Sequence, residues 1–183
     1  LEPKDIIHIS NLIKKNWKKN IGFHAHDNMS RALINCVAAF NNGVNWIDST
    51  VTGMGRGPGN VQTEFALLEF SKYLPKKRDM SLLLKLIDKT FIPMKHKYKW
   101  GTNPYYYLAG QFSIHPTFIQ SMLNDLNLSS DEILSAIENL KKGDGRVFNK
   151  NLIKAGDNLY SKKTSGTWCP FKLIKGKDVL CDF

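Results

Sequence analysis

The chain has 183 residues, a hydrophobic fraction of 42% and a net charge of +10, from 26 lysines and arginines against 16 acidic residues. This composition provides a core for about one domain and excludes a disordered chain, and no apolar run is long enough to span a bilayer. Because the three cysteines are too sparse for a disulfide framework and the N-terminus lacks signal-peptide regions, we expect a cytoplasmic protein.

The positive charge comes mostly from lysine pairs such as Lys14-Lys15 and Lys76-Lys77, which stand at the ends of predicted elements. A basic surface is also typical of proteins that bind polyanions. Because no nucleic-acid fold signature accompanies the lysines, we interpret them as a solvated surface. We therefore expect neither a nucleic-acid partner nor a membrane partner.

Helices and strands alternate in the first part of the chain. Apolar residues at helical spacing predict helices, and runs of β-branched and aromatic residues predict strands. In chain order these are a helix at 4–16, a strand at 21–27, a helix at 28–41, a strand at 44–51 and a helix at 61–73. Pro3 suits the first turn of the first helix, and Gly43 closes the second. This order favours βα units and a parallel sheet.

Between Pro75 and Gly143 the predicted elements are helices, at 80–92, at 116–126, and from the Ser129/Glu132 capping box to Gly143. The tail at 171–183, FKLIKGKDVLCDF, has the pattern of the start of a strand. We therefore divide the chain into a βα segment at 1–75, a helical domain at 76–165, and a tail at 166–183 that begins a further strand or domain.

The motif GFHAHDN at 22–28 carries the clearest chemistry. Because side chains alternate across a strand, His24 and His26 point to one face, and Phe23 and Ala25 to the other. Two imidazoles on one face, at the C-terminal end of a parallel strand, are typical ligands of a divalent cation. The alternative is a pair of hydrogen-bonded structural histidines. The Asp-Asn dipeptide and helix that follow favour the metal.

A glycine-rich loop, GMGRGPGN, follows the second predicted strand at 53–60. Glycines permit positive φ and close backbone approach, and the next helix offers free N–H groups to an anion. Taken alone, the loop is equally typical of an ordinary βα turn. Its place one βα unit after the histidine pair predicts that it forms a wall of the same site.

Together, HxHDN, a helix with an Ala-rich face and IDSTVTGMGRGPGNVQTE resemble the pyruvate-aldolase/HMG-CoA-lyase-like metal-dependent barrels over residues 4–73. That family includes 4-hydroxy-2-oxovalerate aldolase, HMG-CoA lyase, and the isopropylmalate and homocitrate synthases. The resemblance implies an α/β fold, the C-terminal portion of a TIM (β/α)8 barrel followed by a mostly helical domain. It makes IGFHAHD the sixth strand and VNWIDSTV the seventh.

A complete barrel takes about 250 residues, so we expect this chain to be a piece of a longer polypeptide. The resemblance places the remaining metal ligand, an Asp, beside an Arg on a first strand that has no counterpart here. We expect that missing N-terminal barrel half also to supply the general base. The fragment alone is then expected to be inactive.

The resemblance implies that His24 and His26 bind the catalytic metal, Mn²⁺ or Mg²⁺ first, with Zn²⁺ or Co²⁺ as alternatives. Asn60 matches an Asn at or near the metal in several family members, and Asp48 matches a supporting acidic position. The glycine loop lacks the Cys that HMG-CoA lyases carry there. The segment from Trp100 to Pro116 is closer to the C-terminal helical domain of the 4-hydroxy-2-oxovalerate aldolases.

Substrate contacts are expected from Arg31, Gly55 and Gly57. In the similar aldolases a tyrosine from the helical domain positions the substrate, and Tyr106 is the candidate among three consecutive tyrosines, with Tyr105 and Tyr107 as alternatives. The competing interpretation is that these rings pack the helical domain onto the barrel.

The implied reaction is cleavage of a 4-hydroxy-2-oxoacid into pyruvate and an aldehyde. The alternatives are a Claisen-type acyltransferase of the isopropylmalate/homocitrate synthase kind and a non-catalytic truncated barrel. A homo-oligomer or an acylating aldehyde dehydrogenase is a further expected partner.

Residues outside these motifs are expected to have structural roles. We expect His8 to be a surface or packing residue of the first helix, and Cys36 to lie in the core. Trp17 and Trp46 are both expected to pack.

Overall fold

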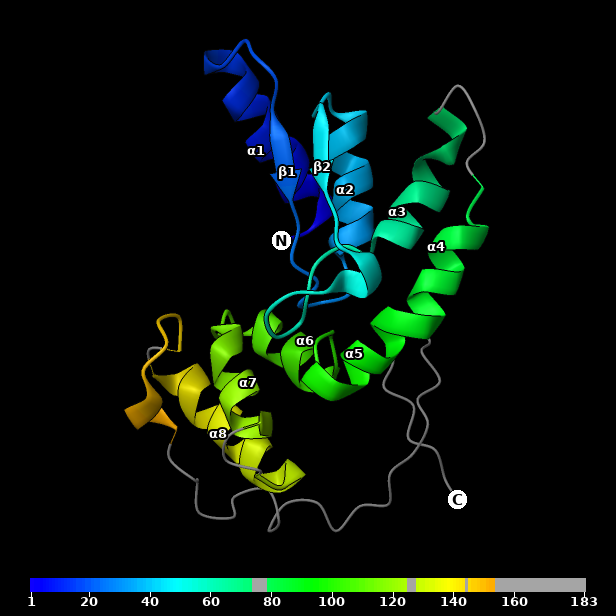
Figure 1. Ribbon diagram of the computed structural model, residues 1–183. Coiled ribbons are helices and arrows are strands. Elements are labelled where there is room, and N and C mark those ends of the chain that lie inside the picture. The colour runs from blue at the N-terminus through cyan, green and yellow to red at the C-terminus, as the bar shows by residue number, and fades with distance from the viewer. Residues whose placement is uncertain (74–78, 125–127, 144, 154–183) are drawn as a thin grey trace, which may run out of the picture.

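The computed structural model describes residues 1–73, 79–124, 128–143 and 145–153 (Figure 1). The predicted alternation of helices and strands is confirmed in the first part of the chain, and helices follow it. The elements are α1 (Pro3–Asn16), β1 (Gly22–His24), α2 (Ala32–Asn41), β2 (Trp46–Asp48), α3 (Thr63–Phe70), α4 (Ser81–Leu86), α5 (Ile92–Tyr98), α6 (Pro104–Gln111), α7 (Pro116–Asn124) and α8 (Ser130–Lys142). The 3₁₀ turns are η1 (Val51–Gly53), η2 (Ser71–Tyr73) and η4 (Lys150–Leu152), and η3 (Ile87–Phe91) is a π-helical turn.

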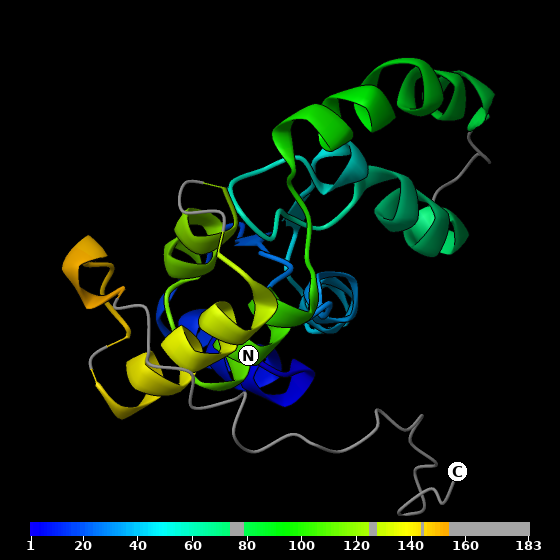
Figure 2. The ribbon, with the colours of Figure 1, turned by 90° about the horizontal axis from the view of Figure 1, so that it is seen from below.

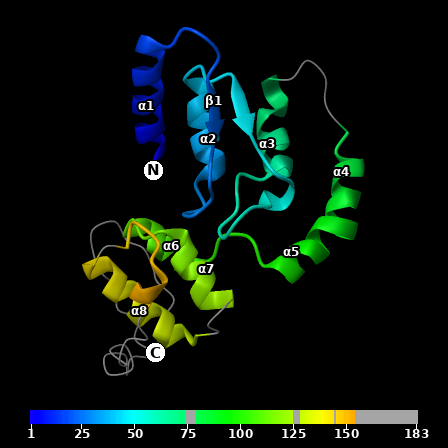
Figure 3. The ribbon, with the colours of Figure 1, turned by 60° about the vertical axis from the view of Figure 1, so that its left-hand side comes forward.

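The sheet pairs β1 and β2 in parallel, as predicted, with Phe23 opposite Ile47 and His24 opposite Asp48. Its covered face carries Phe23 and Ile47, which pack against Ile6 of α1 and against Ala39 of α2. Figure 1 and Figure 3 show both helices beside the two strands. The small residues of α2 permit this close packing, so the covered face forms the core of the βα segment.

The opposite face of the sheet carries His24, Asp48 and Trp46, and no described element covers it. The expectation that Trp46 packs is therefore wrong in this structure, since 63% of its surface is exposed. Trp17 is likewise half exposed, with its indole N–H donating to the carbonyl of Asn20. Cys36, in contrast, is fully buried as expected.

Residues 59–62 return from the glycine loop and join the ends of the two strands. Val61 donates its N–H to the carbonyl of Ala25, while Thr50 donates to the carbonyl of Val61. Isolated bridges pair His26 with Asn60, and Thr50 with Gln62. The loop and the histidine strand are thus held together through the backbone.

The helix predicted at 80–92 continues further than expected, as α4, η3 and α5 in succession. Pro93 falls in the first turn of α5, where its missing N–H is tolerated. Figure 2 shows the helical segment α4–η3–α5 apart from α6–α8. Leu82, near the start of this segment, is 75% exposed. Among the described residues no helix is long and apolar enough to cross a membrane.

Helices α6–α8 enclose a core of large side chains, with Phe118, Ile119, Met122 and Ile137 fully buried. The predicted capping box of α8 is present, since Ser129 and Glu132 exchange hydrogen bonds. These helices lie at the end of the sheet where β1 and β2 finish (Figures 1 and 3). The domain boundary near Pro75 stays a prediction, and the tail at 166–183 lies outside the described residues.

Candidate metal and substrate site

The histidine pair lies on the open face, as the alternation of side chains predicts. Ala25 is buried and Phe23 half-buried, whereas His24 and His26 are exposed. The two imidazole rings meet edge to face with centroids 4.9 Å apart. His24 Nδ1 lies 3.5 Å from Asp48 Oδ2, because the strand register places these residues side by side. Asp48 is thus placed to orient one imidazole.

Asn60 stands next to this pair through its backbone bridge with His26. Its side-chain Nδ2 donates to the carbonyl of Met54 at 3.2 Å. That bond turns the amide so that Oδ1 is the remaining acceptor, and this buried oxygen has no hydrogen-bond partner among the described residues. A buried acceptor without a partner costs roughly 1–3 kcal/mol, which makes it a ready ligand for a cation.

A cavity of about 290 Å³ adjoins the histidines. Both His24 and His26 line it, together with Phe23 and Ala25 from the covered side of the strand, Arg31 and the buried residue Asn35. Arg31 is held there by an ion pair with Glu2 at 3.0 Å. The cavity therefore brings three of the predicted site residues together, and one of them, Arg31, is a cationic group suited to an anionic substrate.

Asp27 serves α2 rather than the open face, because its Oδ1 accepts the N–H of Ala32 at 2.9 Å. Burial raises the pKa of Asp27 above its ordinary value of 3.8, against the opposing effects of this hydrogen bond and the charge on Lys95. The turn before the helix includes Ser30 at φ 53°. These features explain why α2 begins at Ala32. The predicted start at Asn28 is therefore wrong.

Tyr106 is buried in the core of α6–α8, and burial raises its pKa to about 12. Its hydroxyl also lies against the glycine loop, since a Cβ placed on Gly57 would stand 3.3 Å from that oxygen. Gly55 instead lies against the side chain of Asn60. The structure thus places these predicted residues along one loop, and Tyr106 contacts the loop from the helical side.

Residues 100–102 make further hydrogen bonds to the βα segment that no sequence pattern predicted. The indole N–H of Trp100 donates to the carbonyl of Thr52 at 3.1 Å, and the N–H of Gly101 donates to that of Gly57 at 2.9 Å. Thr102 Oγ1 donates to the carbonyl of Asn28 at 3.1 Å. A tryptophan-glycine pair directly after a lysine-rich run is the only sequence signal for this contact.

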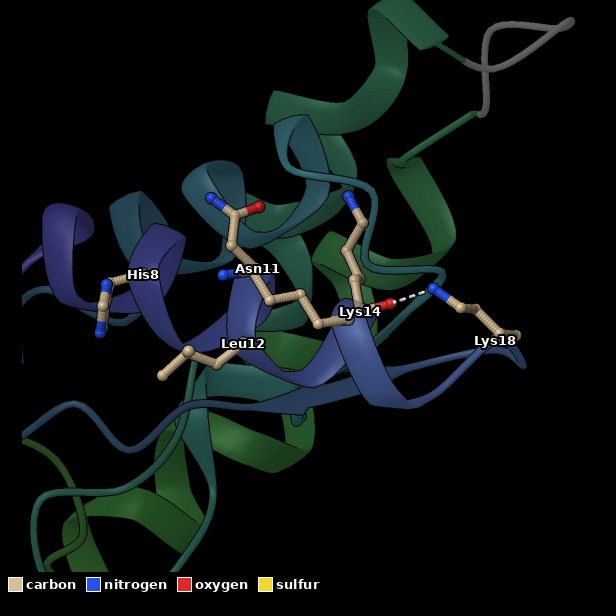
Figure 4. A pocket seen from close by; sticks show the side chains of 6 residues that line it. His8, Asn11, Leu12, Lys14 and Lys18 are labelled. Atoms are coloured by element: carbon tan, nitrogen blue, oxygen red, sulfur yellow. Dashed lines mark hydrogen bonds between the residues drawn. The ribbon is translucent and has the colours of Figure 1, made fainter.

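A second hollow, outside α1, has a different character (Figure 4). Its lysines are used structurally, because Lys18 Nζ donates to the carbonyl of Lys14, and Lys14 Nζ donates to that of Asn42. In Figure 4 His8 points away from these lysines. The expected surface position of His8 is confirmed, and this hollow lacks the convergent groups of a site.

The donor set on the open face fits a divalent cation in part. Two imidazoles and an unpartnered amide oxygen are suitable ligands. Within the described ranges no cluster of three or more His, Cys, Asp or Glu side chains could hold a metal ion. A charged ligand in addition to the two imidazoles, the Asp expected on a first strand outside this chain, therefore stays a prediction.

The HMGL-like family profile matches residues 1–84, which include both strands and the glycine loop. Residues 1–84 are therefore similar to the HMGL-like family. A 4-hydroxy-2-oxovalerate aldolase from Geobacillus genomosp. 3 is 40% identical over 70 residues, 38% of this chain and 21% of the relative. Another from Brevibacillus brevis is 49% identical over 47 residues, 26% of this chain and 14% of the relative.

An oxaloacetate decarboxylase from Mycobacterium tuberculosis is 44% identical over 45 residues, 25% of this chain and 13% of the relative. The crystal structure of the N-terminal domain of a candidate aldolase from Bacteroides vulgatus aligns with a TM-score of 0.62 at 35% identity, over 74% of this chain and 44% of that one. The HMGL-like family and this neighbour indicate a TIM-barrel-type α/β fold. The chain spans 21%, 14% and 13% of the lengths of these three curated relatives, in the order given.

Proposed function

We propose that this HMGL-like chain forms part of a divalent-metal-dependent aldolase that cleaves a 4-hydroxy-2-oxoacid, such as 4-hydroxy-2-oxovalerate, into pyruvate and an aldehyde. The observation that carries the proposal is the pair of imidazoles on the open sheet face, with ring centroids 4.9 Å apart. The unpartnered Oδ1 of Asn60 lies beside them through the bridge to His26. Two curated relatives bearing this aldolase name support the choice of reaction.

In this proposal His24 and His26 hold the cation, Mn²⁺ or Mg²⁺ first, and Asn60 Oδ1 is an additional ligand. The ion supplies a Lewis acid for the carboxylate and keto oxygens of a 2-oxoacid. Asp48 fixes the orientation of the His24 ring from 3.5 Å away. A supporting carboxylate of this kind commonly raises the basicity of a ligating imidazole.

Arg31 is the proposed contact for the substrate carboxylate, since this residue lines the same cavity as the histidines. It must then exchange its present partner, Glu2, for the substrate. Gly55 and Gly57 leave the loop backbone free to approach the substrate closely. Tyr106, which stays protonated with a pKa of about 12, is proposed to act as a hydrogen-bond donor rather than as a base.

The test is pyruvate release from 4-hydroxy-2-oxovalerate by the protein as the cell produces it, with Mn²⁺ present. We expect His24→Ala and His26→Ala to abolish release, whereas His8→Ala on the surface of α1 retains it. Oxaloacetate is the second substrate to assay, because one relative is an oxaloacetate decarboxylase. If pyruvate forms from oxaloacetate and not from 4-hydroxy-2-oxovalerate, the reaction is decarboxylation rather than aldol cleavage. CoA release from an acyl-CoA and a 2-oxoacid would favour the Claisen alternative. No turnover in any of the three assays would overturn the proposal.

A further inference from the structure

The residue directly before the glycine loop has an unfavourable conformation. Thr52 has φ 54° and ψ 20°, the left-handed region, although it is not glycine. A left-handed conformation is unfavourable for a residue with a Cβ. Such residues persist where their surroundings hold them, and they cluster at functional sites.

Both backbone polar groups of Thr52 are held by buried side chains from other elements. Its N–H donates to Glu64 Oε2 of α3 at 3.0 Å, and its carbonyl accepts the indole N–H of Trp100 at 3.1 Å. Glu64 is 8% exposed and Trp100 6% exposed, so water competes with neither bond. These two side chains hold the two peptide groups that flank the Cα of Thr52.

The clamped residue leads directly to Asn60. Gly53, the next residue, accepts the N–H of Asn60 at its carbonyl, at 3.1 Å. The approach is so close that a Cβ on Gly53 would stand 2.8 Å from the carbonyl of Asn60. Movement at Thr52 therefore moves Asn60, and Asn60 is bridged to His26.

We propose that Trp100 is a positioning residue, whose indole N–H locks the left-handed Thr52 peptide and thereby places the Asn60 amide beside His26. The consequence for metal binding rests on the proposed function, but the positioning itself does not. Through this role of Trp100, the segment between α5 and α6 would contribute to the geometry of the site on the sheet, although it lies outside the matched family region.

The test is amide hydrogen exchange of the full 183-residue chain without metal, followed peptide by peptide. Trp100→Phe keeps an aromatic ring and removes the N–H. We expect the amides of Gly53, Met54 and Asn60 to exchange between about fivefold and a hundredfold faster, the range for an unsatisfied buried carbonyl. Trp46→Phe, the same change at an exposed tryptophan, leaves them unchanged.

Thr52→Gly provides the second variant, because glycine adopts the left-handed region without the Cβ penalty. Combined with Trp100→Phe, it is expected to restore slow exchange in the loop, which simple loss of packing would not allow. Unchanged exchange in Trp100→Phe, or equal acceleration in α8, would overturn the proposal. An unfolded Trp100→Phe chain that Thr52→Gly fails to rescue would do the same.

A Mn²⁺ titration of the same variants separates this proposal from the proposed function. Faster loop exchange together with several-fold weaker Mn²⁺ binding supports both. Faster exchange with no Mn²⁺ binding even in the parent chain supports the positioning role and contradicts the metal site.

Discussion

The βα segment and the helices α6–α8 bury different kinds of side chain. In α6–α8 the fully buried residues include Phe118, Ile119 and Met122. The βα segment has two smaller buried clusters, one of which consists mainly of small residues such as Ala32 and Cys36, while its Trp46 stays exposed. Most of the candidate site residues, including His24 and His26, lie on the βα segment, which has the smaller core. The larger core, that of α6–α8, lies next to this segment. We infer that the helices stabilise a site to which they give few side chains.

The largest expected effect tests the stabilising role of α6–α8. Phe118→Ala removes a fully buried ring from their core and is expected to cost about 3–5 kcal/mol in free energy of unfolding. Leu82→Ala, at a side chain 75% exposed on α4, should stay within about 0.5 kcal/mol of the parent. Urea denaturation followed by circular dichroism measures both. Equal losses would mean that the two regions do not differ in this way.

A smaller effect tests the tight backbone of the glycine loop. Gly59 has φ 76°, and a Cβ there would collide with the carbonyl oxygen of Gly53. Gly59→Ala should therefore destabilise by more than the roughly 1–2 kcal/mol of the left-handed conformation alone. Gly22→Ala on β1 is the matched control, since its Cβ would meet only Trp46 Cβ at 3.8 Å. A Gly59→Ala chain as stable as the control would show that the loop is not held as described.

The smallest effect is a pH dependence within α8. Hydrogen bonds from the Ser129 hydroxyl and N–H hold the pKa of Glu132 below its ordinary 4.5. A carboxylate with a lowered folded-state pKa contributes stability above its unfolded pKa and loses it as the pH falls through the folded value. Glu132→Gln should therefore destabilise the chain at pH 7 and have no effect well below pH 4. Ser129→Ala removes the hydroxyl bond and keeps the N–H bond, so the pH 7 effect should shrink in that background. An undiminished effect there would contradict the share of the Ser129 hydroxyl in the capping box.

Much of this fold could be predicted from the sequence, because local patterns determine it. The i, i+2 spacing of His24 and His26 fixes a shared face on any strand. The Ser129/Glu132 box starts α8 through bonds between near neighbours. Such features depend on the period of the backbone rather than on distant contacts.

The remaining features depend on contacts that join distant residues. Trp100 and Thr52 are far apart in the sequence, and neither residue type signals a hydrogen bond between them. The left-handed conformation of Thr52 is equally invisible, because glycine is the residue that normally marks it. Trp46 was predicted to pack because it is large and apolar, and its exposure follows from which face of β2 is covered.

The most direct test of the metal site is isothermal titration of Mn²⁺ into the 183-residue chain and its variants. We predict that His24→Ala and His26→Ala each weaken binding by more than the roughly 10- to 100-fold that loss of an outer-shell partner costs. Asn60→Ala should weaken it less, and His8→Ala should match the parent. Binding by His24→Ala equal to that of the parent, or no binding by the parent, would contradict the metal site on which the account depends.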